Sequence, residues 1–375
     1  MSTTAIPTAP TIGIDARAAV EVPAGRGRVV RELLRGLAAR ADDGHRYVLY
    51  ARAAWQEPAL DARFRWRIIP ARDPWWHVRA ARAANRECSV FLSSNSYLTT
   101  LFLSIPAVPI VYDLITFEPA MRPNRRSTVI EHLTLAPAVR RAAALLAISQ
   151  ATADALVQRF PAAAGRTVVA PLGVTLAPAG ELTAAEAASL PAPGFVLAVG
   201  TLEPRKNLPR LVAAYAGLEE RVQREHPLVV VGARGWETGE TLGALRALGE
   251  RATMLGHVSD AALAELYRRC ALFCFPSLGE GFGLPVLEAM AAGAAVLTSN
   301  VSSLPEVGGD AVAYADPIAV ASIAAGLARL LGDEPARREL GRRAQARARE
   351  FTWERFAQIT LQTLDRVARP GAGGW

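Results

Sequence analysis

The sequence predicts an α/β protein built from two doubly wound domains, each with a parallel sheet covered by helices on both faces. Short apolar segments alternate with helical patterns along the whole chain, and nearly continuous apolar strands are typical of parallel sheets. The 375 residues exceed the usual size of a single core, and 51% of them are hydrophobic. A segment rich in proline and glycine, residues 171–194, separates two series of strands.

Both series follow from short runs of apolar residues. The predicted strands are residues 12–14, 47–50, 90–92, 108–111, 145–148 and 168–170, then 195–199, 228–231, 253–255, 272–275, 295–298 and 312–314. Residues 27–40 illustrate the intervening helices, with apolar residues at helical spacing. We therefore expect one domain over residues 1–175, a second over 190–350, and a terminal helix with a flexible tail over 351–375. Ligands of such sheets bind at the carboxyl ends of the strands.

Composition excludes several classes of protein. Three cysteines, Cys88, Cys270 and Cys274, argue against a disulfide framework, and we expect them to be buried thiols. The first ten residues do not resemble a signal peptide. The longest uncharged stretch, residues 88–112, contains two prolines and several polar residues, so we interpret it as two strands and a loop. These features predict a soluble, cytoplasmic protein.

Net charge is +7, and it is unevenly distributed. Residues 1–180 hold 22 arginines and 13 acidic residues, a balance of +9, whereas the remainder has a balance of −2. A basic half suggests an anionic partner, such as a membrane surface, a lipid phosphate or a nucleic acid. The other interpretation is that arginines are scattered over solvated helices.

The strongest candidate site follows the strand at 272–275, where residues 276–288 read PSLGEGFGLPVLE. Glycines permit close approach of the backbone to a ligand, and Pro285 suits the first turn of a helix. A strand that leads through a glycine loop into a helix presents free amides to a phosphate. Glu280 on the loop and Glu288 in the helix are suited to bind vicinal hydroxyls of a ribose or a hexose.

A second loop follows the strand at 195–199 and reads GTLEPRKNL over residues 200–208. Arg205 and Lys206, the only lysine in the chain, stand just before Asn207, a residue that often caps helices. Cations at this position would neutralise a phosphate leaving group. A third loop, Gly13-Ile-Asp15-Ala-Arg17 with Gly25 and Gly27, resembles half of a dinucleotide fingerprint, but Val30 breaks the spacing.

The segments 200–207 (GTLEPRKN), 256–260 (GHVSD), 280–288, 305–310 (PEVGGD) and 351–354 (FTWE) together resemble family 4 of the retaining glycosyltransferases. The resemblance covers nearly the whole chain and is densest over residues 195–317. It implies the GT-B fold, in which two Rossmann-like domains face each other across a cleft and a C-terminal helix returns towards the N-terminal domain. It also implies that the first domain binds the acceptor and the second binds a nucleotide sugar.

The resemblance assigns roles to individual residues. Lys206, with Arg205, would hold the donor pyrophosphate, and Glu280 would hold the transferred sugar. The other donor-binding residues implied are Gly25, which closes on the donor, Gly232 and Val258 near the nucleoside, Gly281, Phe282, Gly283 and Leu284 at the phosphate and sugar, and Glu288 at the ribose. Tyr112 and Asp113 stand where many relatives have His-Asp, next to the reacting sugar and its acceptor.

The absence of an Asp-x-Asp sequence predicts a reaction without a divalent metal, and no cofactor is implied. The sequence of residues 201–207, TLEPRKN, is similar to a segment of bacterial mannosyltransferases. We therefore expect a retaining transfer of a hexose, mannose from GDP-mannose, to a glycan or lipid-linked acceptor in bacterial cell-surface polysaccharide synthesis. The alternative donor is a UDP-sugar, with glucosyl or N-acetylglucosaminyl transfer to a soluble oligosaccharide or a small metabolite.

Two other classes of protein fit the sequence less well. A nucleotide-sugar epimerase needs a full G-x-G-x-x-G and a Tyr-x-x-x-Lys pair, which this chain lacks. A membrane- or nucleic-acid-binding protein without transferase activity would leave the donor-site pattern unexplained, and we expect no nucleic-acid partner.

Membrane contact remains compatible with transfer. Residues 73–86 are predicted to form a short helix. Arg79, Arg82 and Arg86 share one face of it, and Trp75 and Trp76 stand at its start. Arg122, Arg125 and Arg126 would extend this patch. We therefore expect peripheral contact with an anionic membrane, at the inner face of the cell membrane; the other interpretation places both tryptophans in the core.

Overall fold

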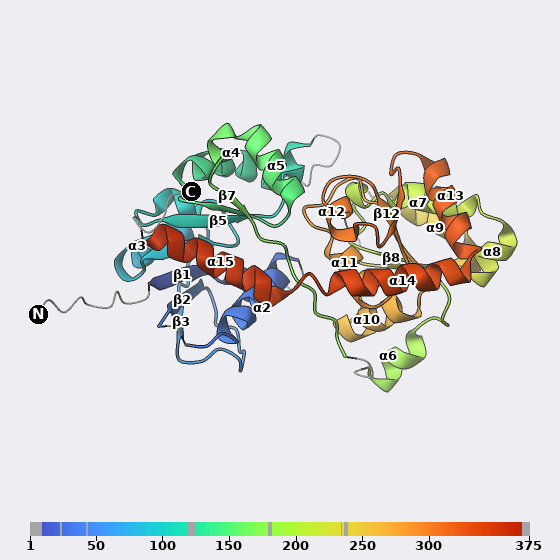
Figure 1. Cartoon of the computed structure of the whole chain (residues 1–375), viewed down its shortest axis with the longest axis horizontal. Coiled ribbons are helices and arrows are strands. Elements are labelled where there is room, and N and C mark those ends of the chain that lie inside the picture. The colour runs from blue at the N-terminus through green and yellow to red at the C-terminus, as the bar shows by residue number, and fades with distance from the viewer. Residues whose placement is uncertain are drawn as a thin grey trace, which may run out of the picture. The chain divides into compact units, whose positions relative to one another are not determined.

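A computed structural model describes residues 10–22, 25–42, 44–118, 125–178, 182–233, 235 and 239–369 (Figure 1). The chain divides into two compact units. The first comprises Met1–Phe117, Arg122–Gly173 and Thr352–Trp375, and the second comprises Glu118–Met121 and Val174–Phe351. Arg122 and the end of the predicted tail, residues 370–375, lie outside the described residues.

The first unit contains a seven-stranded sheet with the order β3-β2-β1-β4-β5-β6-β7, and all of its strand pairs are parallel. Its strands are β1 (Thr11–Asp15), β2 (Arg46–Ala51), β3 (Phe64–Ile68), β4 (Val90–Ser93), β5 (Ala107–Val111), β6 (Leu145–Ala147) and β7 (Thr167–Val169). Its helices are α1 (Arg17–Glu21), α2 (Arg26–Ala38), α3 (Trp75–Glu87), α4 (Arg125–Arg141), α5 (Gln150–Arg159) and α15 (Trp353–Ala368), with 3-10 turns η1 (Thr99–Phe102), η2 (Ile115–Phe117) and η4 (Pro161–Ala163).

The second unit contains a six-stranded parallel sheet with the equivalent order β10-β9-β8-β11-β12-β13. Its strands are β8 (Val196–Val199), β9 (Leu228–Val231), β10 (Ala252–Gly256), β11 (Leu272–Phe275), β12 (Val296–Ser299) and β13 (Ala313–Ala315). Its helices are α6 (Ala184–Ser189), α7 (Leu208–Ala216), α8 (Glu220–Glu225), α9 (Gly239–Ala247), α10 (Asp260–Arg269), α11 (Leu284–Ala291), α12 (Leu304–Gly308), α13 (Val320–Leu331) and α14 (Glu334–Ala348), with η5 (Pro204–Lys206) and η6 (Gly249–Arg251). The predicted fold class, two doubly wound Rossmann-like domains, is confirmed.

The last helix, α15, belongs to the first unit and packs against α2 (Figure 1). Two glycines of the first unit, one on α2 and one after β7, let α15 approach closely. A Cβ atom on Gly173 would lie 2.2 Å from the backbone nitrogen of Trp353, and one on Gly36 would lie 2.9 Å from the Cβ of Ala357. The expected return of the C-terminal helix to the N-terminal domain is therefore confirmed.

All twelve predicted strands are present, and the residues that the structure describes contain one further strand, β3, which the sequence does not predict. β3 reads FRWRI and lies at the edge of its sheet, with its two arginines exposed. The arginines alternate with Phe64, Trp66 and Ile68, so the segment lacks the continuous apolar run of the buried strands. An edge strand faces water along one side, which explains the mixed pattern.

Helix α3 covers most of the segment predicted to be helical. Trp75 is 67% exposed, whereas Trp76 is completely buried with the Arg17 guanidinium stacked 3.7 Å from its ring centroid. The expectation that Trp76 stands at an interface is therefore wrong, because its ring fills the core of the first unit. Arg79, Arg82 and Arg86 are exposed, as the helical spacing predicts.

Candidate functional site

The two predicted loops of the second unit follow β8 and β11, which are adjacent parallel strands. Because their carboxyl ends meet at the same edge of the sheet, the loops lie together. The first passes through η5 into α7, and the second passes through Gly283 into α11. Gly283 has a φ of +100° and precedes a proline in the first turn of α11, so a residue without a side chain suits this position.

Glu280 is the centre of a buried ionic cluster in these loops. Its Oε1 lies 2.7 Å from Nζ of Lys206, and its Oε2 lies 2.6 Å from Nη1 of Arg205. Ser277 donates a further hydrogen bond to Oε1 at 2.7 Å. Burial opposes ionisation of this carboxyl group, but the charges of Lys206 and Arg205 outweigh it and lower the pKa of Glu280 to about 2. Glu280 is therefore ionised at neutral pH.

The two cations have different surroundings. Arg205 bridges two carboxylates, because its Nη2 also lies 2.7 Å from Oε1 of Glu203. Lys206 is buried, and its ammonium lies 4.7 Å from the centroid of the Phe275 ring. Burial lowers the pKa of Lys206, while the neighbouring Glu280 opposes this shift. Lys206 thus presents a compact cation to the same carboxylate that Arg205 holds from the other side.

Asn207 ties the two loops together. It adopts a left-handed conformation with φ of 59° at the start of α7, where a residue with a short polar side chain is tolerated. Its side-chain amide donates to the carbonyls of Pro276 and Pro317 at 2.9 and 2.6 Å, so it does not cap the helix through its side chain. Leu278 donates its backbone N–H to Arg205 O, which adds a second link. These contacts position Lys206 against Glu280.

The backbone of Glu280 is held by two serines that the sequence did not single out. Glu280 donates its N–H to the hydroxyl of Ser302 at 3.0 Å, and Ser303 donates to the Glu280 carbonyl at 2.9 Å. Next to it, the Phe282 side chain is buried and packs edge-on against Phe351, with ring centroids 5.8 Å apart. The predicted donor-binding role of Phe282 can therefore only involve its backbone.

Glu288 lies on α11 and is buried. Tyr267 on α10 donates its hydroxyl to Glu288 Oε2 at 3.0 Å. This hydrogen bond fixes the carboxylate about one turn inside the helix that begins beside Glu280. Tyr267 was not predicted from the sequence, because α10 and α11 are brought together only by packing.

Gly232 and Val258 follow β9 and β10. A Cβ atom on Gly232, whose φ is +149°, would lie 2.0 Å from the Gly200 carbonyl oxygen, so this position requires glycine. A cavity of about 540 Å³ opens at these strand ends. Val258 does not line it; the residues that do are Gly232, Ala233, Leu242, Leu245, Arg246, Gly249, Ala252, Met254, Leu255, Gly256 and His257.

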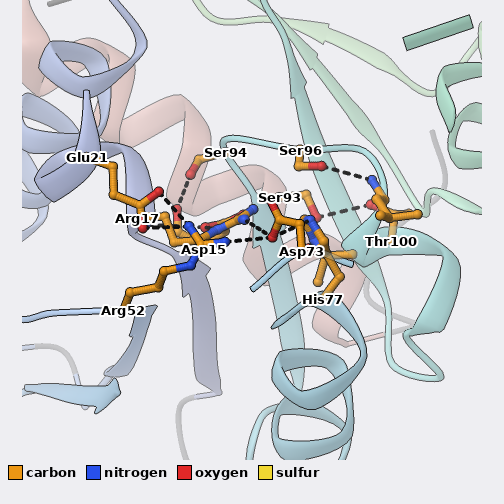
Figure 2. A network of polar contacts seen from close by, with 12 residues as sticks. Asp15, Arg17, Glu21, Arg52, Asp73, His77, Ser93, Ser94, Ser96 and Thr100 are labelled. Atoms are coloured by element: carbon orange, nitrogen blue, oxygen red, sulfur yellow. Dashed lines mark hydrogen bonds and ion pairs between the residues drawn. The ribbon is translucent and has the colours of Figure 1, made fainter. Parts of the chain in front are cut away.

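In the first unit, Asp15 and Arg17 form a buried ion pair at the carboxyl end of β1, with 2.7 Å between Arg17 Nη2 and Asp15 Oδ2. Figure 2 shows how the pair continues to Asp73 and to Arg52, which also pairs with Glu21. Since Asp15 is buried and bound to Arg17, it is occupied in linking β1, α1 and the residues before α3. Asp15 and Arg17, which belong to the third predicted loop, therefore have a structural role in the first unit.

The network reaches Tyr112 through Ser94, which donates its hydroxyl to the Asp15 carbonyl (Figure 2). The Tyr112 hydroxyl donates to the Ser94 carbonyl at 2.7 Å. Burial raises the pKa of Tyr112, so the phenol stays neutral. The side chain of Tyr112 is therefore engaged within the unit.

Arg26, the first residue of α2, lies 5.1 Å from the Tyr112 ring centroid and follows Gly25. Asp113 accepts a hydrogen bond from the N–H of Ile115 at 3.1 Å. Gly25 has a φ of +55° with open space around it. The structure thus brings Gly25, Tyr112 and Asp113 to one place on the first unit.

Two kinds of feature are absent from the described part of the chain. It contains no group of three or more His, Cys, Asp or Glu residues that could hold a metal ion. Among the same residues, no helix is both long and apolar enough to cross a membrane.

Comparison with known proteins matches both halves of the chain to glycosyltransferases. The family described as "Glycosyl transferases group 1" matches residues 185–347, and "Glycosyltransferase Family 4" matches residues 23–178. The O-antigen chain mannosyltransferase B of Escherichia coli is 36% identical over 271 residues, which span 69% of each chain. The serotype-specific mannosyltransferase WbdA of Escherichia coli is 38% identical over 180 residues, which span 46% of this chain and 22% of that protein.

Solved structures give the same fold. A sucrose-phosphate synthase from Thermosynechococcus elongatus superposes with a TM-score of 0.74 at 22% identity, covering 94% of this chain and 97% of that one. WaaG, a glycosyltransferase involved in lipopolysaccharide biosynthesis, superposes with a TM-score of 0.70 at 16% identity and covers 94% of this chain and 99% of its own.

Proposed function

Since this chain belongs to the family 4, group 1 glycosyltransferases, we propose that it is a mannosyltransferase that uses GDP-mannose. Its product would be a glycan or lipid-linked glycan in bacterial cell-surface polysaccharide synthesis. The relatives support this choice of sugar, because two of them are O-antigen or serotype-specific mannosyltransferases. The observation that carries the proposal is the buried cluster of Lys206, Arg205 and Glu280 at the ends of β8 and β11.

Lys206 would stabilise the charge that develops on the leaving diphosphate, and the amides of residues 281–284 would add dipoles at the start of α11. Glu280 would accept hydrogen bonds from hydroxyls of the transferred sugar. Arg205, which bridges Glu203 and Glu280, is suited to hold the Glu280 carboxylate in place as the donor enters. Its contribution to the phosphate would then be secondary to that of Lys206.

The proposed reaction retains the configuration at the anomeric carbon. The acceptor oxygen forms a bond to that carbon on the face from which the diphosphate departs, and the bond from the carbon to the phosphate oxygen breaks. The hydroxyl proton of the acceptor passes to the departing phosphate. Cations and helix amides would supply the electrostatic stabilisation, so we propose that no divalent metal or cofactor takes part.

The nucleoside would bind at the ends of β9 and β10. Glu288, fixed by Tyr267, would accept hydrogen bonds from the ribose hydroxyls. Gly232 leaves room for close approach beside a cavity of about 540 Å³ that could take a purine base. A UDP-sugar is the alternative donor, with transfer of glucose or N-acetylglucosamine to a soluble oligosaccharide or a small metabolite.

We further propose that the first unit contacts the inner face of an anionic membrane, in the cytoplasm, without use of nucleic acid. Trp75, Arg79, Arg82 and Arg86, which we call the α3 stripe, recur at spacings of four, three and four along α3 and are all exposed. Each arginine would contribute about 1 kcal/mol near an anionic surface. Arg125 and Arg126 lie in the first turn of α4, but their side chains are not described.

Thermal unfolding with a panel of donors tests the choice of donor. At 100 times its dissociation constant, a true donor stabilises the folded protein by about 2.7 kcal/mol. We expect GDP-mannose to raise Tm more than UDP-glucose, UDP-N-acetylglucosamine or free mannose at the same concentration. A larger shift with a UDP-sugar would instead support the alternative donor.

A further inference from the structure

Phe351 begins the segment 351–354, FTWE, which contributes to the family resemblance but has no role in the reaction as proposed so far. It is the last residue of the second unit and lies between α14 and α15. Its half-buried ring packs edge-on against Phe282 in the loop before α11, with ring centroids 5.8 Å apart and an interplanar angle of 77°. Phe351 therefore contacts the loop whose backbone amides would face the donor diphosphate.

The side chain of Phe282 anchors that loop. Phe282 stands between Gly281 and Gly283, and only 3% of it is exposed. Glycine has more conformational freedom to lose on ordering than any other residue, and it offers no side chain that could pack. The ring of Phe282 is therefore the one side chain within residues 281–283 that can hold the backbone in a single conformation. Its contact with Phe351 contributes to that conformation.

Arg347 holds the ring of Phe351 in place. Its guanidinium lies over that ring, 5.6 Å from the centroid, where a cation and an aromatic face attract each other. The same guanidinium donates from Nε to the Val307 carbonyl at 2.8 Å and from Nη2 to the Glu306 carbonyl at 2.7 Å. A Cβ atom on Gly309 would lie 2.7 Å from Arg347 Nε, so a glycine leaves room for the guanidinium. Arg347 is thus fixed to the end of α12 and orients Phe351 from there.

We propose that Phe351 is a positioning residue for the donor. Its ring, which Arg347 orients, keeps Phe282 in its buried place. Phe282 in turn keeps the amides of residues 281–284 directed at the diphosphate. Phe351 and Arg347 act through these amides and do not themselves bind the donor. The inference rests on the proposed function, because it concerns the diphosphate subsite of that reaction.

The expected effect follows from the energetics of ordering a loop. Dipoles stabilise a charged ligand best when they are already in place, since no reorganisation then opposes binding. Without the Phe351 ring, the glycines on either side of Phe282 would let the loop sample other conformations. Ordering the loop would then oppose donor binding. The loss should appear in the affinity for the donor and leave the affinity for the acceptor unchanged.

Steady-state kinetics of Phe351→Leu test the role of the ring. Donor KM should rise by roughly 3- to 10-fold, the scale of one edge-on aromatic pair, and acceptor KM should stay within about twofold of wild type. A loss of folded protein would instead lower kcat and leave donor KM unchanged. Phe351→Tyr keeps the ring and should restore a donor KM close to that of wild type. An unchanged donor KM in folded Phe351→Leu would overturn the proposal.

Phe160→Leu is the matched control. Phe160 is half-buried in the first unit and packs edge-on against Phe117, also with ring centroids 5.8 Å apart and with an interplanar angle of 80°. The variant removes a ring from an equivalent pair that has no contact with the donor loop. Its donor KM should equal that of wild type. An equal rise in donor KM in Phe160→Leu and Phe351→Leu would contradict a specific role for Phe351.

A double-mutant cycle tests whether Arg347 acts through Phe351. Arg347→Ala alone should raise donor KM by roughly 3-fold, the scale of a cation–π contact at a partly exposed site. In the Phe351→Leu background, the same change should alter donor KM by less than about twofold, because residues on one path are not additive. Arg343→Ala, which removes a charge one turn earlier on α14 that pairs with Asp310, is the control and should leave donor KM unchanged. Additive effects of Arg347→Ala and Phe351→Leu would contradict the proposed path.

Calorimetric titration with GDP separates this proposal from the proposed function. The Kd for GDP should rise by roughly 3- to 10-fold in Phe351→Leu, as donor KM does, and stay unchanged in Phe160→Leu. Weaker binding of GDP by Phe351→Leu, in a protein whose wild type transfers no sugar, would overturn the proposed function and leave the positioning role standing. A wild type that transfers mannose, with the same Kd for GDP in wild type and Phe351→Leu, would overturn the positioning role alone.

Discussion

The ammonium of Lys206 lies 2.7 Å from Oε1 of Glu280, although 74 residues separate them in the chain. The contact joins the loops after β8 and β11, and both side chains are buried. A buried ion pair of this kind is weak evidence for stability, because desolvation of both charges is costly. The donor site that we propose explains the pair: it keeps a cation and a carboxylate together where a diphosphate and a sugar would bind.

The stability of the protein in acid should depend on Glu280. Its pKa in the folded protein is about 2, below the ordinary value near 4.5. Its charged form therefore stabilises the fold above the pKa of the unfolded chain, and this contribution is lost as pH falls towards 2. Between about pH 5 and 2, Tm of wild type should fall more steeply than Tm of Glu280→Gln. Parallel Tm profiles measured by circular dichroism would contradict this.

Tyr267 should affect donor affinity with little effect on turnover. Tyr267→Phe removes the hydrogen bond to Glu288 while keeping the ring that packs edge-on against Phe273. Loss of one such bond should raise donor KM by roughly 3- to 10-fold, with kcat within about twofold. Tyr314→Phe, which removes a hydrogen bond to the Gly309 carbonyl elsewhere in the same unit, is the control and should leave donor KM unchanged. An unchanged donor KM in Tyr267→Phe would show that Glu288 does not need this partner.

The reaction should proceed without a divalent metal. Turnover measured in EDTA should match turnover in Mg²⁺ within about twofold, because Lys206, Arg205 and helix amides would supply the stabilisation that a metal gives elsewhere. Activity that is lost in EDTA and restored by Mn²⁺ or Mg²⁺ would show that a metal ion, rather than these groups, stabilises the leaving diphosphate.

Membrane contact should depend on the α3 stripe. Wild type should co-sediment with vesicles that contain anionic lipids at low salt, and release at high salt, because the attraction is electrostatic. A triple variant of Arg79, Arg82 and Arg86 to Ala should lose most of this binding. Neutral vesicles should bind neither protein.

A second triple variant provides the control. Changing Arg221, Arg338 and Arg342 to Ala removes the same charge from exposed helices of the other unit and should leave binding intact. An equal loss of vesicle binding in the two triple variants would show that net charge, and not the α3 stripe, determines the binding. No binding of wild type to anionic vesicles would favour a soluble acceptor.

Much of the fold could be predicted because the buried strands of a parallel sheet form nearly continuous apolar runs in the sequence. The pattern of the edge strand β3 does not predict a strand, because arginines interrupt it. The position of Trp76 beside Trp75 predicts an interface for both rings, whereas Trp76 is buried. Only tertiary packing distinguishes the two rings: Trp76 lies beneath the Arg17 guanidinium, and Trp75 remains exposed.

The candidate site was predictable where the residues lie in the two loops, as Lys206 and Glu280 do. Its supporting residues were not. Tyr267 reaches the site from another helix, and Ser302 from the loop after β12. Such contacts depend on distances between segments that are remote in sequence.

The rate of sugar transfer by Lys206→Ala and Glu280→Gln is the decisive test of the proposed donor site. With saturating GDP-mannose and a mannoside acceptor, kcat should fall by roughly 10²-fold or more in each variant, the scale of losing one preorganised electrostatic partner. Circular dichroism should establish that both variants are folded, because removal of one partner leaves a buried charge. If both folded variants kept a kcat close to that of wild type, the pair of Lys206 and Glu280 would not be the donor site, and the proposed mechanism would be contradicted.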